Sequence, residues 1–111
     1  MHTSGAVARV WHGWTTVGNA DAYQAIVENE VFPSILERQV PGLLGAHLTR
    51  SDEVVEGEVE FATIIWFESD DAVSSLMGAD HRKAYVPERA RSVLSRFDAE
   101  AKHFQVLGYF S

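Results

Sequence analysis

The segment from Glu58 to Glu68, with the sequence EVEFATIIWFE, has the strongest strand pattern in the chain. It is rich in β-branched and aromatic residues, which favour extended structure. Its middle is apolar and lacks the alternation of a half-exposed strand, which is typical of a strand covered on both faces. We therefore expect this strand to lie in a sheet with other material packed against each side.

Three further segments have strand character, two before this strand and one after it. They are Ala6 to Thr16, Leu43 to Arg50, and Ala101 to Phe110. The acidic segment Ser51 to Gly57 separates the second strand from the third, and we expect it to form a hairpin loop.

Apolar residues recur close to a helical period over Ala20 to Gln39, where Pro33 should kink or split the helix. A second helical region begins after Ser69, which is a good N-terminal cap, and runs to about residue 97. Gly78 and Pro87 interrupt this region, so we expect two or three shorter helical pieces. The predicted order of elements is β-α-β-β-α-β.

With right-handed crossovers, this order predicts an α+β fold of the ferredoxin-like kind. We expect one domain over residues 1–111, with a four-stranded antiparallel sheet and both helices on one face. The helix-free face should carry about half of the large strand aromatics, and such a surface is not stable in water. We therefore predict that two copies pair as a homodimer, sheet against sheet, in a dimeric α/β barrel. The aromatics considered are Trp11, Trp14, Phe61, Trp66, Phe67, Phe104 and Tyr109.

The composition is that of a globular protein, with 46% hydrophobic and 23% charged residues. The chain has no cysteine, which excludes disulfides, thiolate metal sites and cysteine nucleophiles. Its net charge of −7 repels phosphate backbones, so we expect no nucleic-acid partner. No apolar run reaches the ~18–20 residues that span a membrane, and Met1 to Gly5 lacks the features of a secretory signal. A cytoplasmic location without a membrane partner is expected.

Several short motifs occur in order along nearly the whole chain. They are Ala8–Thr15 (ARVWHGWT), Pro41-Gly42, Phe67–Ala72 (FESDDA), Gly78–Arg82 (GADHR), and Arg96–Asp98 followed by Lys102–Val106. Together they resemble the antibiotic biosynthesis monooxygenase family. The resemblance implies a dimeric ferredoxin-like barrel. Some members of the family oxidise polycyclic aromatic substrates, such as anthrones, with oxygen and with neither a metal nor a flavin. Relatives of the family degrade haem, so the resemblance implies these two activities as candidates.

The resemblance assigns positions to the residues that family members use. An ungapped comparison puts Thr63 and Phe67 where the quinone-forming members have an Asn and a Trp. It puts Val73 and Pro87 where those members have a Tyr and an Arg. The haem-degrading relatives use an Asn on the first strand and a Trp and a His on the second helix. This chain has neither that Asn nor that Trp, and His81 lies about one turn too early.

Two polar residues of the first strand are the candidate catalytic residues. His12 is a natural acid or base at neutral pH, and removing a proton from a phenol or anthrone would create an anion that reacts with oxygen. Arg9 could bind a substrate carboxylate or phenolate, or stabilise an enolate. The alternatives that stay open are a core or interface role for His12 and an ion pair across the dimer for Arg9.

Aromatic walls would hold a flat substrate and exclude water from it. We expect the pocket to lie between the sheet and the helices, with a volume of ~300 Å³ or more. The predicted substrate-binding residues are Trp11, Trp14, Trp66, Phe67, His81 and Tyr85.

The histidines are scattered singly, without the i, i+4 or His-x-His spacing of a metal site. A site assembled in three dimensions from His12, His47 and His103 has no support from spacing. We therefore predict neither a metal nor another cofactor.

The function favoured by the sequence is a cofactor-independent monooxygenase that acts on a small hydrophobic or aromatic molecule. One alternative is a non-catalytic dimer that binds a small ligand or has only a structural role. A further alternative is a haem-binding or haem-degrading protein.

Overall fold

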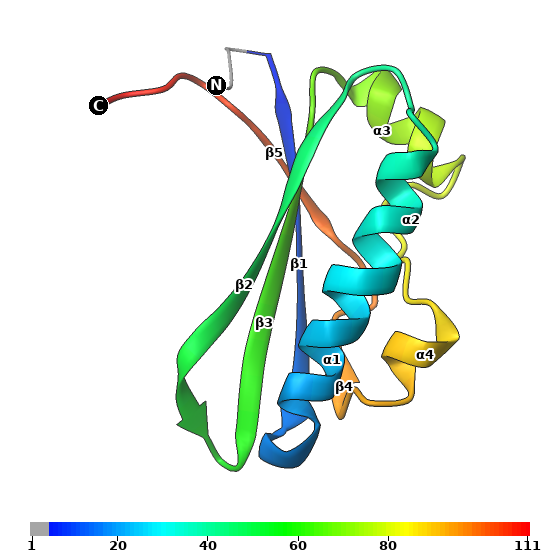
Figure 1. Ribbon diagram of the computed structural model, residues 1–111. Coiled ribbons are helices and arrows are strands. Elements are labelled where there is room, and N and C mark those ends of the chain that lie inside the picture. The colour runs from blue at the N-terminus through cyan, green and yellow to red at the C-terminus, as the bar shows by residue number, and fades with distance from the viewer. Residues whose placement is uncertain (1–4) are drawn as a thin grey trace.

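A single antiparallel sheet forms one layer of the molecule. The computed structural model describes residues 5–111, and residues 1–4 lie outside the described part. The strand order is β2-β3-β1, with both β4 and β5 paired to the free edge of β1 (Figure 1). β4 and β5 together therefore take the place of the predicted last strand. The strands are β1 Val7–Thr16, β2 Leu43–Val55, β3 Glu58–Phe67, β4 Arg96–Phe97 and β5 Lys102–Gln105.

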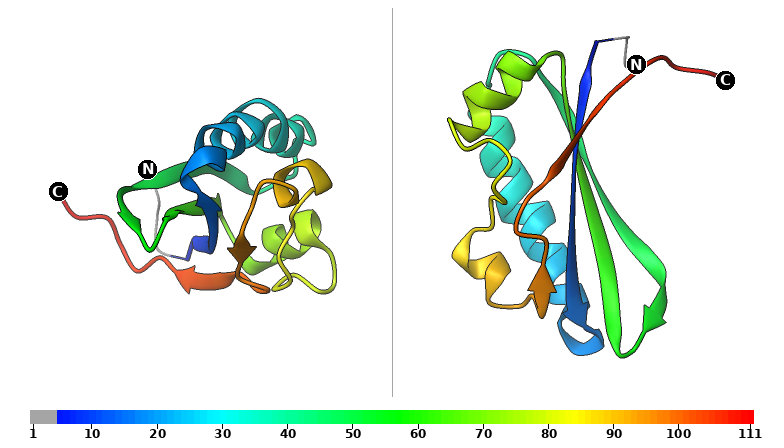
Figure 2. Two further views of the ribbon diagram at one scale, coloured as in Figure 1. Left: turned by 90° about the horizontal axis from the view of Figure 1, so that it is seen from below. Right: turned by 180° about the vertical axis from the view of Figure 1, so that it is seen from behind.

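The helices form a second layer, and the views in Figures 1 and 2 place all of them on the same face of the sheet. This arrangement confirms the predicted α+β, ferredoxin-like fold. No helix in residues 5–111 is long and apolar enough to cross a membrane. The helical elements are η1 Val17–Asn19, α1 Ala20–Ile26, η2 Val27–Val31, α2 Phe32–Glu37, α3 Asp70–Met77 and α4 Glu88–Arg91.

β1 lies inside the sheet and determines which side chains face the helices. It pairs with β3 over its full length, so that Trp11 lies opposite Thr63 and His12 lies opposite Ala62. Successive side chains of a strand point to opposite faces. Trp11 belongs to the core beneath the helices, which identifies the helix-covered face. Arg9 shares that face, whereas His12 lies on the open face.

Two clusters of buried side chains fill the space between the sheet and the helices. One is built around Trp11, Tyr23 and Phe61, and the rings of Tyr23 and Phe61 meet edge to face with centroids 4.8 Å apart. The other is built around Ile35 and Phe67, close to the first turn of α3. Edge-to-face aromatic pairs add about 0.5–1.5 kcal/mol beyond the burial of their area. The two clusters fix the helical layer against the sheet.

The first helical region passes through Pro33 without ending. Residues Val27–Val31 are π-helical, and the N–H of Phe32 donates to the carbonyl of Val27, five residues earlier. A proline lacks the N–H for a regular helical bond, and its ring presses against the carbonyl four residues before it. The wider π turn relieves this crowding. The predicted disturbance at Pro33 therefore takes the form of a π turn.

The hairpin between β2 and β3 is much tighter than the sequence predicted. Only Glu56 and Gly57 turn the chain, with φ angles of 51° and 79°, and this is the two-residue turn that matches the twist of paired strands. The pairing shifts between Arg50 and Val54, so a bulge absorbs the extra residues of β2. The prediction of a loop over 51–57 is therefore wrong, because pairing with β3 keeps polar residues extended.

The second helical region divides into two pieces, as predicted, but it ends at Arg91 and not near residue 97, where the chain instead forms β4 against β1. The side chain of Ser69 accepts a hydrogen bond from the backbone N–H of Ala72 at 3.2 Å and caps α3. Gly78, with a φ of 83°, ends α3. The segment 78–87 is irregular and leads to the short helix α4. This irregular segment lies beside the candidate site described below.

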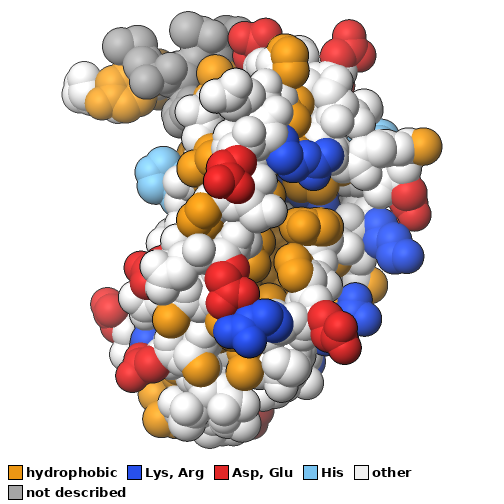
Figure 3. All heavy atoms as spheres, turned by 45° about the vertical axis from the view of Figure 1, so that its right-hand side comes forward, with side chains coloured by type: hydrophobic (Ala, Val, Ile, Leu, Met, Phe, Trp, Pro, Cys, Tyr) orange, Lys and Arg blue, Asp and Glu red, His pale blue; other side chains and the backbone are white. Residues whose placement is uncertain are grey.

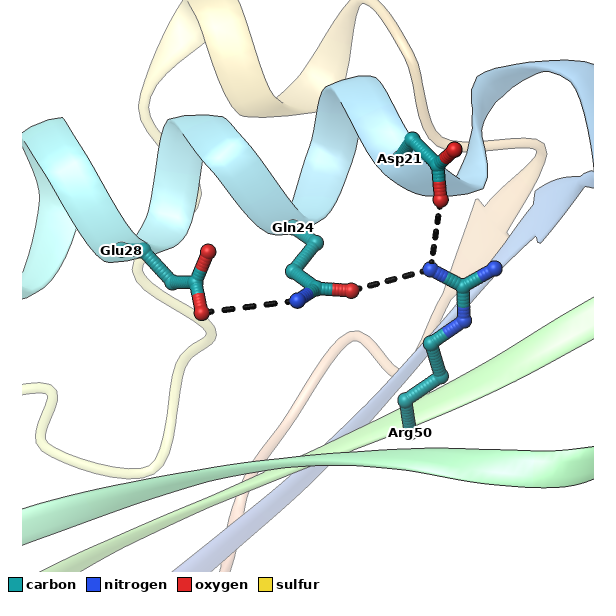
Figure 4. Close-up of polar contacts among 4 residues, drawn as sticks. All are labelled: Asp21, Gln24, Glu28 and Arg50. Carbon is teal, nitrogen blue, oxygen red and sulfur yellow. Dashed lines mark hydrogen bonds and ion pairs between the residues drawn. The ribbon is translucent and has the colours of Figure 1, made fainter.

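A polar network ties α1 to β2 at the surface (Figure 4). The guanidinium of Arg50 donates to a carboxylate oxygen of Asp21 at 2.8 Å and to the side-chain oxygen of Gln24 at 2.9 Å. The amide of Gln24 donates in turn to Glu28 at 3.4 Å. An exposed ion pair of this kind contributes only about 0–1 kcal/mol, so it orients α1 more than it stabilises the fold.

Gly42 provides a test of how closely β2 approaches α3. Its φ is +86°, and a Cβ there would lie 2.7 Å from the Cβ of Ala72 and 2.9 Å from the Cγ of Glu68. We expect Gly42→Ala to lower the free energy of unfolding by about 1–3 kcal/mol, because both backbone strain and overlap are introduced. Urea denaturation measures this change.

Gly18→Ala is the matched control, because a Cβ at Gly18 meets no heavy atom within 4 Å. It should change the free energy of unfolding by no more than about 0.5 kcal/mol. Equal effects of the two substitutions would contradict the close approach at Gly42.

Candidate functional site

A cavity lies between the helix-covered face of the sheet and the helices, where the sequence predicted a pocket. Arg9 and Trp11 of β1, Thr63 of β3, Tyr23 of α1 and Tyr85 of the segment 78–87 line it. The remaining described lining is apolar, and within residues 5–111 it includes no histidine and no carboxylate. Figure 3 shows hydrophobic side chains gathered in a hollow on the helix side of the molecule, with charged side chains around it.

Among the described residues, Arg9 is the only charged residue of the lining, and its relative exposure is 4%. Its guanidinium donates to the backbone carbonyls of His81 and, at 2.9 Å, of Lys83. A third hydrogen bond joins Arg9 to Nε2 of His103 at 3.0 Å. No carboxylate pairs with Arg9 in residues 5–111. The cavity therefore contains a buried cation whose partners in this structure are all neutral.

The electrostatics around Arg9 follow from this burial. Burial lowers the pKa of Arg9, although a guanidinium stays protonated at any ordinary pH. Burial also lowers the pKa of His103, and the nearby charge of Arg9 lowers it further. A neutral His103 can accept the hydrogen bond from Arg9 through Nε2. Its ring also stacks on that of His81, with centroids 5.5 Å apart.

The other polar groups of the cavity are donors rather than bases. Burial raises the pKa of Tyr23 to about 12, so its phenol keeps its proton at neutral pH. The indole N–H of Trp11 donates to the carbonyl of Asp98 at 2.7 Å, which leaves Trp11 as a wall of the cavity. Thr63 adds a hydroxyl on the sheet side. The arrangement can stabilise an anion but holds no side chain suited to take up a proton.

The cavity is smaller than predicted. Its volume is about 50 Å³, against the ~300 Å³ expected of a ligand site. Two larger hollows adjoin it, with volumes of about 350 Å³ and 270 Å³. Tyr85 lines all three spaces and is 50% exposed. The predicted volume is therefore wrong for this cavity, because the ligand-sized spaces are the neighbouring hollows, which share part of their lining with it.

His12 and Trp14 lie on the other side of the sheet from this cavity. Nδ1 of His12 lies 2.7 Å from a carboxylate oxygen of Glu60, and its ring stacks on Trp14. Arg96 lies over the ring of Trp14, 3.9 Å from its centroid. The prediction that His12 and Arg9 act in one pocket between sheet and helices is therefore wrong. Because they are three residues apart in one strand, their side chains point to opposite faces.

The predicted substrate-binding residues are divided among several environments. Trp11 and Tyr85 line the cavity. Trp66 lies on the open face and donates to His47 at 2.9 Å, while Phe67 is fully buried in the second core cluster. His81 contributes its carbonyl to Arg9 and its ring to His103. The prediction that Trp14 and Trp66 wall this pocket is wrong, because both point to the open face.

Sequence reasoning missed two polar residues of the lining. Tyr23 belongs to the apolar stripe of the first helix, and that stripe gives no sign of a cavity beneath it. Thr63 stands at the position where the family resemblance places an Asn, so comparing the positions could have indicated that Thr63 lines the cavity. Pro87, at the position of the family's Arg, also lines the cavity.

The histidines do not assemble into a metal site. His12 and His47 lie on the open face of the sheet, whereas His103 lies beside Arg9 under the helices. Within residues 5–111, no three histidine, aspartate or glutamate side chains are grouped as metal ligands.

Comparison with solved structures shows that the chain has the fold of antibiotic biosynthesis monooxygenase-type proteins. A monooxygenase from the gene ActVA-Orf6 of Streptomyces coelicolor, in complex with nanaomycin D, is 22% identical, with a TM-score of 0.64 over 97% of this chain and 92% of that chain. SnoaB, a cofactor-independent oxygenase from Streptomyces nogalater, is 13% identical, with a TM-score of 0.58 over 97% of both chains.

Rv0793 from Mycobacterium tuberculosis is 17% identical, with a TM-score of 0.60 over 96% of this chain and 100% of that chain. No protein-family model and no curated protein matches the sequence. At these identities the likeness shows a common fold, and the reaction has to be argued from the cavity.

The lowered pKa of His103 predicts a pH dependence of stability. Its pKa lies below the ordinary value of 6.5, so the unfolded chain binds more protons than the folded chain between the two values. The part of the free energy of unfolding that depends on a neutral His103 is therefore fully present above about pH 6.5. It is lost as the pH falls through the folded pKa of His103. His103→Gln keeps an acceptor for Arg9 but does not titrate.

Urea denaturation of both proteins at about pH 7.5 and about pH 5.5 tests this linkage. The His103→Gln variant should lose less of its free energy of unfolding over this interval. An equal or larger loss in the variant would contradict the effect assigned to His103.

Proposed function

We propose that this chain is a small oxygenase that binds a hydrophobic, aromatic molecule at the cavity beneath its helices. Its fold is that of antibiotic biosynthesis monooxygenase-type proteins. The observation that carries the proposal is Arg9, a buried guanidinium that faces an apolar cavity and has no carboxylate partner in residues 5–111. A buried charge without a counter-ion costs several kcal/mol, and a substrate anion would supply the missing charge.

Arg9 would act by stabilising the anionic form of the substrate. A phenol or anthrone that loses a proton becomes an electron-rich phenolate or enolate, and its carbon can react with oxygen. Two C–H bonds of a ring CH₂ break, one oxygen atom forms the new carbonyl, and the other leaves as water. Oxygen accepts all four electrons, so the reaction needs no further reductant.

The proton would leave the substrate for solvent rather than for a side chain. The lining contains no histidine or carboxylate, and Tyr23 holds its own proton because its pKa is about 12. Arg9 lowers the pKa of a bound acidic group, because a nearby positive charge favours the ionised form. This mechanism suits substrates that are already acidic, and it assigns no proton-transfer role to His12.

A ring system fits only if it extends from the cavity into the neighbouring hollow. Tyr85 lines both spaces and is half exposed, so its side chain has room on the solvent side to change its rotamer. Exposed side chains change rotamer in picoseconds to nanoseconds. We therefore assign Tyr85 the role of a movable wall between solvent and Arg9.

Oxygen uptake in the presence of anthrones tests the proposed function. Arg9→Gln should lower the rate by about a hundredfold, the range seen when one anion-stabilising donor is removed from an active site. His12→Gln should keep the rate within about twofold, because His12 lies on the opposite face of the sheet. The rate is measured with an oxygen electrode, and circular dichroism checks that both variants are folded.

A larger loss in His12→Gln than in Arg9→Gln would overturn this assignment.

The second candidate function is non-catalytic binding of the same class of ligand, which the absence of a base among the described lining residues favours. That function predicts Arg9-dependent binding without any oxygen uptake.

We also propose that the open face of the sheet pairs with a second copy of the chain. Val10, Trp14, Ile64 and Trp66 share this face with His12, and no helix in the described part covers them (Figure 2). These side chains are only partly buried in the single chain, and contiguous exposed apolar surface marks an interface. A face-to-face pair of sheets would bury it and give the dimeric α/β barrel expected from the sequence.

Substitution at the centre of that face tests the dimer. Ile64→Lys places a charge on the open face and should convert the protein to a monomer, because an unpaired charge is costly to bury. Leu36→Lys is the matched control, since Leu36 is a 48% exposed residue of α2 on the helical layer. Analytical ultracentrifugation measures the mass. A dimeric Ile64→Lys variant would contradict pairing through this face.

A further inference from the structure

The larger hollow outside Tyr85 has a basic rim that the proposed reaction does not use. Its floor is apolar and includes Ile35, Leu76 and Met77, and its rim carries Arg38, Lys83 and Asp80. Its volume of about 350 Å³ is within the range of small-molecule sites. The hollow shares Ile35, Met77 and Tyr85 with the cavity that contains Arg9. One ligand can therefore contact both spaces.

Both cations of this rim lack a carboxylate partner within the described chain. Arg38 makes one long hydrogen bond, 3.5 Å, to the carbonyl of Leu76, and Lys83 forms no ion pair with Asp80 or Glu100. Arg50, Arg89 and Arg96 each pair with an acidic side chain. Arg82, Arg91 and Lys102 also form no ion pair in residues 5–111, and Arg38 and Lys83 differ from them by lining the hollow. In a protein with a net charge of −7, two unpaired cations beside an apolar hollow favour an anionic ligand.

The backbone at Lys83 is held in place from two sides. Its carbonyl accepts from the guanidinium of Arg9 at 2.9 Å, and it forms an antiparallel bridge with Glu100. Its N–H donates to the carbonyl of Asp80 at 3.2 Å. The backbone position of Lys83 is therefore fixed by the fold, and one of the hydrogen bonds that fix it comes from the guanidinium of Arg9.

We propose that the substrate is an aromatic carboxylic acid whose ionised carboxylate lies between Arg38 and Lys83. This inference rests on the proposed function and specifies the substrate class for the same site. The apolar floor of the hollow takes the ring system, and the reacting end points past Tyr85 toward Arg9. Asp80, on the same rim, opposes the carboxylate and limits its affinity.

The test measures binding separately from turnover. The probe is anthraquinone-2-carboxylate, a flat aromatic acid that is already oxidised, and its neutral partner is anthraquinone-2-carboxamide. Binding is followed by quenching of tryptophan fluorescence and by isothermal titration calorimetry. We expect the acid to bind about tenfold more tightly than the amide, and we expect added salt to weaken only the acid.

Variants of the rim identify the residues responsible. Arg38→Gln and Lys83→Gln should each weaken binding of the acid by about three- to tenfold and leave the amide unchanged, as expected for loss of a partly screened charge pair. Asp80→Asn should tighten binding of the acid. Lys102→Gln is the control, because Lys102 lies on β5 and lines none of these spaces, and it should have no effect.

The outcomes for this site and for the proposed function are distinguishable. Equal binding of acid and amide, or acid binding that ignores both rim substitutions, overturns the carboxylate site even if Arg9-dependent oxygen uptake is found with neutral anthrones. Binding that depends on Arg38 and Lys83 supports the site even if no oxygen is consumed. Absence of binding by both probes overturns the site, and oxygen uptake then decides the function on its own.

Discussion

The pairing of β1 with neighbours on both sides is the constraint on which the rest of this structure depends. β3 holds one edge over the full length of the strand, and β4 and β5 hold the other. A slip of one residue would exchange the two faces, moving Arg9 and Trp11 out of the core and His12 into it. Because both edges are paired, the register is fixed.

This register buries the charge of Arg9, which lowers the stability of the fold. Three neutral acceptors offset part of the cost of burying its charge, but a carboxylate would offset more. Two of these acceptors belong to the backbone of the segment 78–87, so the same guanidinium also holds that irregular segment against the sheet. Residues that depart from the rules of stability in this way are expected at functional sites. Arg9 therefore connects the fold, the cavity and the proposed chemistry.

The cavity and the neighbouring hollow differ in where they carry positive charge. The cavity is apolar and contains one buried cation, Arg9, whereas the hollow is apolar with exposed cations, Arg38 and Lys83, in its lining. A ligand with an acidic group at one end and a reactive ring at the other matches both. Tyr85 lines both spaces, as do Ile35 and Met77.

Much of the fold could be predicted because its signals are local. The strand pattern at 58–68, the helix cap at Ser69 and the disturbance at Pro33 all appear where the sequence places them. The acidic segment 51–57 was misread, because pairing with β3 extends residues whose own preference is for a loop. The lining of the cavity was predicted only in part. Trp11 and Tyr85 were predicted and do line it, whereas Tyr23 and Thr63 were missed, because residues from distant parts of the chain meet there only after folding.

The sequence by itself determined the order of elements, the two-residue alternation of β1 and the presence of Arg9 and His12 in one strand. It could not determine which face of that strand the helices cover, because β1 and β3 carry apolar residues on both faces. The packing of α1 and α2 against Trp11 and Phe61 decided it. That choice placed Arg9 in the cavity and His12 on the open face, since neighbouring positions in a strand point in opposite directions.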